Sequence, residues 1–184
     1  MKKVLFAIAA MAACVSASAQ VWISGGVESR GVGFSNQSTY GDDKTTTQWY
    51  FNPAIGYALD DALEVGLELS LSGRSHDETS TFDFKVAPFA RYTFLSEGDF
   101  SMFLQGDVAF TSYSSKKPDH KGQAFGINIK PGIKYILTDN FAMVATFGSL
   151  YYNHKDRTEF GYDDQNGFGC SIGSGLSFSL VYTF

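Results

Sequence analysis

The last seventeen residues of the chain, 168 to 184, alternate between apolar and small or polar side chains. Every even position except Ser174 is apolar, and most odd positions hold glycine, serine or threonine. A period of two is the pattern of a β-strand with one apolar face and one polar face. The run exceeds the roughly 3–10 residues usual for strands of soluble proteins, and it is long enough to cross a bilayer at a tilt. This pattern constrains the fold more than any other feature of the sequence.

The same alternation recurs along the chain. It is clear in residues 49–59, 63–72, 82–94, 100–110 and 125–137, and it is weaker in residues 21–34. Residues 141–152 are apolar on both faces, which leaves their register open. Together with the final run, these segments predict eight strands.

The connections between these strands alternate in length. Three are short and rich in turn formers, at residues 60–61, 96–99 and 138–140. Four are longer and hydrophilic, at roughly 35–48, 74–80, 114–122 and 153–167. Short turns on one side and long loops on the other are typical of a membrane barrel. An even number of strands places both termini on the side of the short turns.

The amino terminus predicts export. Residues 1–19 read as a signal peptide, with a basic start, an apolar stretch and a small-residue site for cleavage between Ala19 and Gln20. The sequence around Cys14 loosely resembles a lipobox, which is an alternative. Residues 20–184 would then form one mature domain, in which Cys170 is the only cysteine and no internal disulfide can form.

Composition narrows the class of protein further. Loss of Lys2 and Lys3 leaves 12 basic against 19 acidic residues, a net charge of −7, which argues against a nucleic-acid binder. The mature segment holds no run of about 18 apolar residues that would make a membrane helix. In lipid every backbone polar group must be paired within the protein. An exported chain whose strands alternate between apolar and polar residues can therefore span a membrane only as a closed barrel.

A short motif repeats on the second, fourth, sixth and eighth strands. The pattern Pro-x-x-x-Tyr-x-Leu/Phe occurs at residues 53–59, 88–94 and 131–137, and residues 178–184 match it with Phe in the proline position. We expect its tyrosines to form a periplasmic aromatic girdle; they are Tyr57, Tyr92, Tyr135 and Tyr182.

With this recurrence and its terminal Phe184, the mature chain resembles the small outer-membrane β-barrel domain family, which includes the OmpX and OmpA barrels, in its Bacteroidota form. The resemblance implies an all-β, eight-stranded, antiparallel up-and-down transmembrane β-barrel in the outer membrane of a Gram-negative bacterium. Tyr182 and Phe184 resemble the signal read by the barrel-assembly machinery. The implied partners are outer-membrane lipid, lipopolysaccharide, that machinery and, transiently, periplasmic chaperones.

The face opposite the apolar one carries charges of both signs. The predicted interior set is Glu28, Arg30, Glu64, Glu68, Asp83, Lys85, Arg91, Asp107, Lys130 and Lys134. Charges in a narrow interior must be paired, so we expect a salt-bridged plug. A narrow, porin-like, water-filled channel is the alternative. A soluble lipocalin-like barrel or sandwich, with the apolar face inside, is a third arrangement of the same strands.

The sequence shows no catalytic constellation and implies no cofactor or metal. The three histidines, His76, His120 and His154, lie in predicted outer loops beside acids, but their spacing matches no metal motif. Ser149 and His154 are the nearest pair for a lipid-modifying enzyme, a weaker alternative. We therefore expect a monomeric, non-enzymatic barrel with a structural or surface-interaction role. The loop sequences identify no extracellular ligand.

Overall fold

The structure is a computed structural model that describes residues 21–27, 33–38, 45–76, 79–116, 120–156, 164–171 and 177–184. The regular elements in these ranges are β-strands. None of these ranges contains a helix that is long and apolar enough to cross a membrane. The predicted signal peptide, with Ala19 and Gln20, lies outside the described residues, as do the interior charges predicted at Glu28 and Arg30.

The twelve strands group into the eight predicted segments. Four segments are single long strands: β5 (Leu63–His76), β6 (Thr79–Glu97), β7 (Phe100–Lys116) and β8 (His120–Ile136). Each of the others is divided into two strands. They are β1 (Val21–Val27) with β2 (Gly33–Ser38), β3 (Thr45–Phe51) with β4 (Pro53–Ala58), β9 (Phe141–Thr146) with β10 (Ser149–Asp156), and β11 (Gln165–Ser171) with β12 (Ser177–Thr183).

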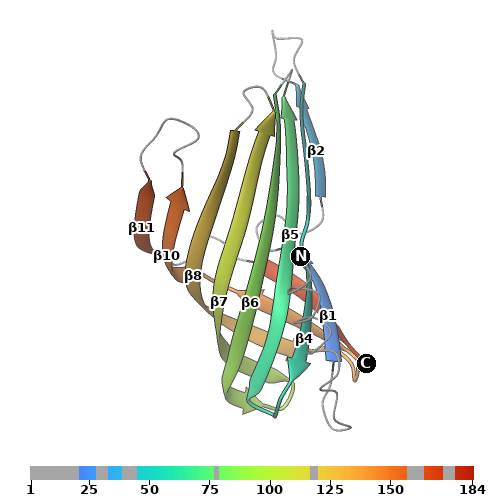
Figure 1. The fold of residues 1–184 in the computed structure, drawn as a ribbon. Helices are drawn as coiled ribbons and strands as arrows, with labels where there is room; N and C mark the ends of the chain where they lie inside the picture. The colour runs from blue at the N-terminus through green and yellow to red at the C-terminus, as the bar shows by residue number, and fades with distance from the viewer. Residues whose placement is uncertain are drawn as a thin grey trace.

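Eight strands pair antiparallel in a closed ring (Figure 1). Each strand of the series β1, β4, β5, β6, β7, β8, β9 and β12 pairs with the next, and β12 pairs with β1 to close the ring. Toward the other end, β2 and β3 continue the sheet beyond β5, and β10 and β11 continue it beyond β8. The predicted all-β, eight-stranded antiparallel barrel is confirmed.

The distribution of side chains is the reverse of that in a soluble protein. Large apolar residues point outward and are exposed, as Ile55 (51%), Phe110 (54%) and Leu180 (49%) show. Polar side chains are buried instead, including Arg91 and Asp107. An exposed apolar band around a polar interior is the arrangement of a lipid-embedded barrel. The soluble alternative, with the apolar face inside, is therefore wrong.

Two of the predicted outer loops are largely strand. Residues 74–76 and 79–80 belong to the β5–β6 hairpin, in which His76 pairs with Thr79. Residues 114–116 and 120–122 belong to the β7–β8 hairpin. Their polar sequences looked like loops because both faces of a hairpin that extends beyond the bilayer are in water. A transmembrane strand needs only about 9–11 residues, and β6, β7 and β8 are longer by several residues.

The three repeated prolines sit where a strand ladder is interrupted. The β1–β4 ladder ends at the pair Gly25–Pro53, and β6 makes no pair with β7 at Ala87 and Pro88. At Pro131 the neighbour of β8 changes from β10 to β9. Proline cannot donate to a ladder, so the interruptions lie where that donor is missing.

The interruption beside Pro131 explains why the sequence of residues 141–152 did not show which of its faces points outward. The Phe147 amide donates to the Pro131 carbonyl at 3.1 Å, and Gly148 has a φ of 79°. This break separates β9 from β10 and shifts the alternation by one residue, because Thr146 and Ser149 face the same side although three positions separate them. A segment with such a shift is apolar on both faces when it is read as one strand.

Candidate functional site in the barrel interior

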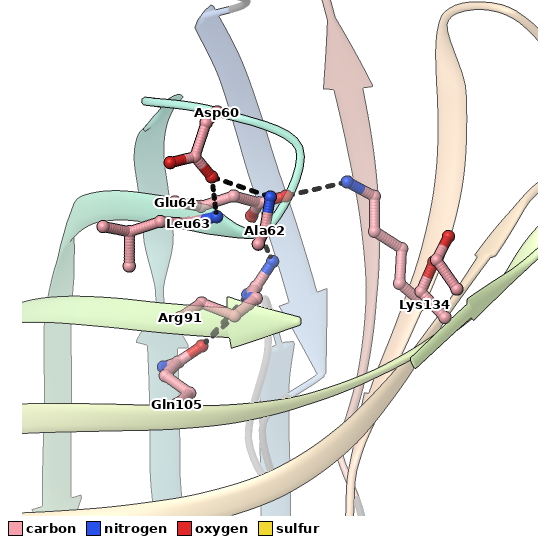
Figure 2. Close-up of polar contacts among 9 residues, drawn as sticks. Asp60, Ala62, Leu63, Glu64, Arg91, Gln105 and Lys134 are labelled. Atoms are coloured by element: carbon pink, nitrogen blue, oxygen red, sulfur yellow. Dashed lines mark hydrogen bonds and ion pairs between the residues drawn. The ribbon is translucent and has the colours of Figure 1, made fainter. Parts of the chain in front are cut away.

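Neighbouring strands bring a charged cluster together inside the barrel (Figure 2). Glu64 on β5 pairs with Arg91 on β6, and Arg91 pairs with Gln105 on β7, so these inward side chains lie at one level. Arg91 Nη1 donates to Glu64 Oε2 at 2.9 Å. Arg91 Nη2 and Nε donate to Gln105 Oε1 at 3.0 and 3.3 Å.

A fourth residue joins this cluster from another part of the wall. Lys134, on β8, donates from Nζ to Glu64 Oε1 at 2.8 Å, so that two cations share one carboxylate. Strands β6 and β7 separate Lys134 from Glu64 in the ring, so the contact crosses the interior (Figure 2). We call Glu64, Arg91, Gln105 and Lys134 the ionic cluster.

The turn before β5 orients this cluster. Asp60 Oδ1 accepts hydrogen bonds from the backbone amides of Ala62 and Leu63 at 2.8 and 2.7 Å (Figure 2). An aspartate that accepts from nearby amides stabilises a tight turn. These bonds fix the start of β5 one residue before Glu64.

Three aromatic rings surround the Arg91 guanidinium. Its central carbon lies 5.2 Å from the ring centroid of Trp22, 5.7 Å from that of Phe89 and 4.5 Å from that of Phe103. A guanidinium within about 6 Å of a ring is attracted to the π face, and the attraction grows when water is excluded. All three rings are buried. We call Trp22, Phe89 and Phe103 the aromatic collar.

Each ring of the collar lies over a glycine of a neighbouring strand. Trp22 pairs with Gly56, Phe89 with Gly66 and Phe103 with Gly132. A Cβ atom at any of these glycines would overlap the paired ring. The glycines therefore provide the space that lets three large rings fit in a barrel of eight strands.

Two further ion pairs lie on the interior face close to the collar and the ionic cluster, because Asp107 pairs with Phe89 and Lys130 with Gln105. Lys85 Nζ is 2.6 Å from Glu68 Oε1, and Lys130 Nζ is 3.1 Å from Asp107 Oδ2. Asn128 also donates to Asp107, at 2.6 Å. The eight described members of the predicted interior set are Glu64, Glu68, Asp83, Lys85, Arg91, Asp107, Lys130 and Lys134, four acids and four bases.

Asp83, the remaining member of that set, accepts a hydrogen bond from the Ser72 hydroxyl at 3.5 Å. A cavity of about 50 Å³ lies beside the collar, lined in part by Ser24, Asn52, Glu68 and Thr146. Such a volume holds only a few water molecules. The described interior is therefore occupied by side chains at the level of the ionic cluster.

The four motif tyrosines point outward near the short turns. Tyr92 and Tyr135 are exposed, while Tyr57 and Tyr182 are partly covered. The Tyr182 ring packs against Phe141 and Phe184, with centroids 5.0 and 5.1 Å apart.

The structure does not bring together the residues that were considered for a catalytic pair or a metal site. Ser149 bonds Ser171 and faces inward, whereas His154, five positions along β10, bonds Asn166 and faces the other side. His76 Nδ1 lies 2.7 Å from Thr46 Oγ1. Within the described ranges, no three His, Cys, Asp or Glu side chains are grouped so that they could hold a metal ion.

Sequence reasoning missed Trp22 and Phe103 as interior residues. Both residues stand at positions that alternate in step with the polar side chains of their strands. A large aromatic residue among small or polar side chains could therefore have indicated that each ring lies inside the barrel. The paired glycine on the adjacent strand is a second signal, and it becomes readable only once the register is known.

The chain matches a known family over nearly its whole length. The family described as outer membrane protein beta-barrel domain matches residues 5–184, so the chain belongs to that family and is a bacterial outer-membrane protein. No curated protein matches the sequence.

Several solved structures are similar. Neisserial surface protein A is 13% identical, with 90% of this chain and 92% of that chain covered and a TM-score of 0.45. The N-terminal beta-barrel domain of Pseudomonas aeruginosa OprF is 17% identical, with 90% and 97% covered and a TM-score of 0.49.

Proposed function

We propose that the protein is a monomeric scaffold of the outer membrane whose interior is closed by the ionic cluster and the aromatic collar. The observation that carries the proposal is the environment of Arg91, which is bound by Glu64 and Gln105 and enclosed by three rings. Such a scaffold acts through what its outer surfaces contact.

The energetics favour a closed interior. Taking a guanidinium or carboxylate out of water costs several kcal/mol unless a partner offsets it, so each ion of the cluster requires the others to stay in place. An ion that passed the collar would have to displace Arg91 from Glu64 or Lys134 from the same carboxylate.

The decisive experiment is single-channel recording of the refolded protein in a planar bilayer, with folding checked by a heat-modifiable gel shift. Wild type and Glu68→Ala are expected to be silent, because neither lacks the collar. The double variant Phe89→Ala/Phe103→Ala removes two rings that lie over glycines, and it is expected to conduct. Discrete, reproducible steps from folded wild type would overturn the proposal.

A narrow channel is the second candidate, and the two further ion pairs of the interior favour it. Glu68 with Lys85 and Asp107 with Lys130 line a polar interior next to a small cavity. If this candidate is right, wild type conducts and neutralising Lys130 changes its ion selectivity.

The proposed partners follow from the surfaces. Lipid and lipopolysaccharide would surround the exposed apolar band, and the polar β5–β6 and β7–β8 hairpins are available for an extracellular ligand. Tyr182 and Phe184 lie together at the end of the closing strand, where the assembly machinery would read them after periplasmic chaperones deliver the chain.

A further inference from the structure

The outward face of the barrel is hollowed beside the strand pair that begins the ring. A groove of about 530 Å³ lies over the adjacent strands β4, β1 and β12 and extends to β5. Figure 1 shows β1, β4 and β5 next to one another at one side of the barrel. Its lining includes Gly25, Pro53, Ile55, Leu69, Leu180 and Tyr182.

The sequence explains why the surface recedes at this point. Gly25 pairs with Pro53 on one side and with Leu180 on the other, and the β1–β4 ladder ends at that first pair. Gly25 has no side chain, and a Cβ placed on it would meet nothing within 4 Å. The floor of the groove is therefore bare backbone between taller apolar neighbours.

We infer that this groove binds one acyl chain of an outer-membrane lipid. The groove opens on the exposed apolar band of a protein that belongs to an outer-membrane family, so hydrocarbon surrounds it. An unfilled gap would forfeit the dispersion contacts of its walls, and a flexible chain can follow its shape. The inference rests on the membrane location and not on the closed interior, so either proposal can fail without the other.

The lining also specifies which part of the lipid is held. Among the described residues that line the groove, the phenol of Tyr182 is the one ionisable group, and none has a charged side chain to pair with a headgroup phosphate or amine. The site therefore selects hydrocarbon and is indifferent to the headgroup. A second copy of the chain is the competing occupant, but it would offer a convex barrel wall to a concave site.

The chain offers a matched pair of variants. Gly25→Phe fills the groove from its floor. Gly106→Phe is the control, because Gly106 is an exposed glycine at an outward position of β7, its Cβ would also meet nothing within 4 Å, and it does not line the groove. Both variants place a phenyl ring on the lipid-facing surface of a strand.

The test is native mass spectrometry of the folded proteins in detergent, titrated with phosphatidylethanolamine and, separately, with phosphatidylglycerol of the same acyl chains. Wild type and Gly106→Phe are expected to retain one lipid of either kind, and Gly25→Phe is expected to lose it. Equal retention by all three proteins, absence of lipid from wild type, or retention of only one headgroup would overturn the inference. So would a two-chain mass for wild type that Gly25→Phe reduces to one chain, because a second copy would then occupy the groove.

Discussion

At the residue scale, the interior depends on a carboxylate that serves two cations. Glu64 bonds Arg91 through one oxygen and Lys134 through the other, and its side chain is almost entirely buried. The pair formed by Lys85 and Glu68 is more exposed to water. Water screens such a pair, so its contribution to stability is smaller than that of the buried cluster.

This difference predicts unequal costs of removing the two carboxylates. Glu64→Ala leaves the buried Arg91 and the partly exposed Lys134 without their shared carboxylate, and it is expected to lower the free energy of unfolding by about 3–5 kcal/mol. Glu68→Ala also destabilises the barrel, but by less. Urea unfolding in lipid vesicles, followed by the gel shift, measures both. Equal costs, or an unchanged midpoint for Glu68→Ala, would contradict this account.

At the element scale, several neighbouring strands pack through a large aromatic ring on one strand that lies over a glycine on the next. The three collar pairs are inside the barrel, and Trp49 with Gly73 repeats the arrangement on the outer face. In each pair a Cβ on the glycine would overlap the ring. Packing of aromatic rings over glycines is a known means of stabilising strand pairs.

Substitution of one collar glycine tests this arrangement. Gly66→Ala forces the Phe89 ring from its place and is expected to cost about 1–3 kcal/mol by overpacking. Gly106→Ala, where the added methyl meets nothing, is the control and is expected to be nearly neutral. Chemical unfolding of the two variants side by side gives the comparison. A cost shared by both would point to backbone effects and not to the ring.

The break between β9 and β10 gives a second prediction at this scale. Gly148 has a φ of 79°, in the left-handed region that other residues enter at a cost of about 1–2 kcal/mol. Gly148→Ala should destabilise the barrel by about that amount. Gly126→Ala is the matched control, since its Cβ would make only an ordinary contact of 3.5 Å. If the two variants unfold alike, the break does not require a glycine.

At the scale of the whole molecule, the barrel is closed by its last strand. β12 joins β1 to β9, and the Phe184 amide donates to the Val21 carbonyl at 3.0 Å, although the Phe184 side chain is 69% exposed. Apart from its edge contact with the Tyr182 ring, a side chain so exposed packs little against the rest of the protein. Its proposed role therefore belongs to assembly and not to the stability of the folded barrel.

Phe184→Ala separates these two roles. The variant is expected to refold in detergent as wild type does, because the backbone bond to Val21 remains. In cells, most of it should be missing from the outer-membrane fraction, because the terminal aromatic is the proposed recognition signal. Fractionation with immunoblotting, beside in vitro refolding, measures both. Normal assembly in cells would exclude Phe184 from that role.

The sequence by itself determined the eight strand segments and, except in residues 141–152, the direction of their faces. Alternation is a local property, so Glu64, Arg91 and Lys134 could be placed inside the barrel without knowledge of their neighbours. The apolar face could likewise be assigned to lipid. The predicted boundaries of two outer loops were wrong, because the polar ends of these hairpins are in water on both faces. Their sequences therefore do not alternate between apolar and polar residues.

Only the tertiary structure decided which interior groups meet. The contact of Lys134 with Glu64 crosses two intervening strands. The distance between the two side chains depends on how far each strand is staggered relative to the next around the ring. The same stagger sets Trp22, Phe89 and Phe103 over their glycines. Stagger is a property of the closed sheet, and no single strand encodes it.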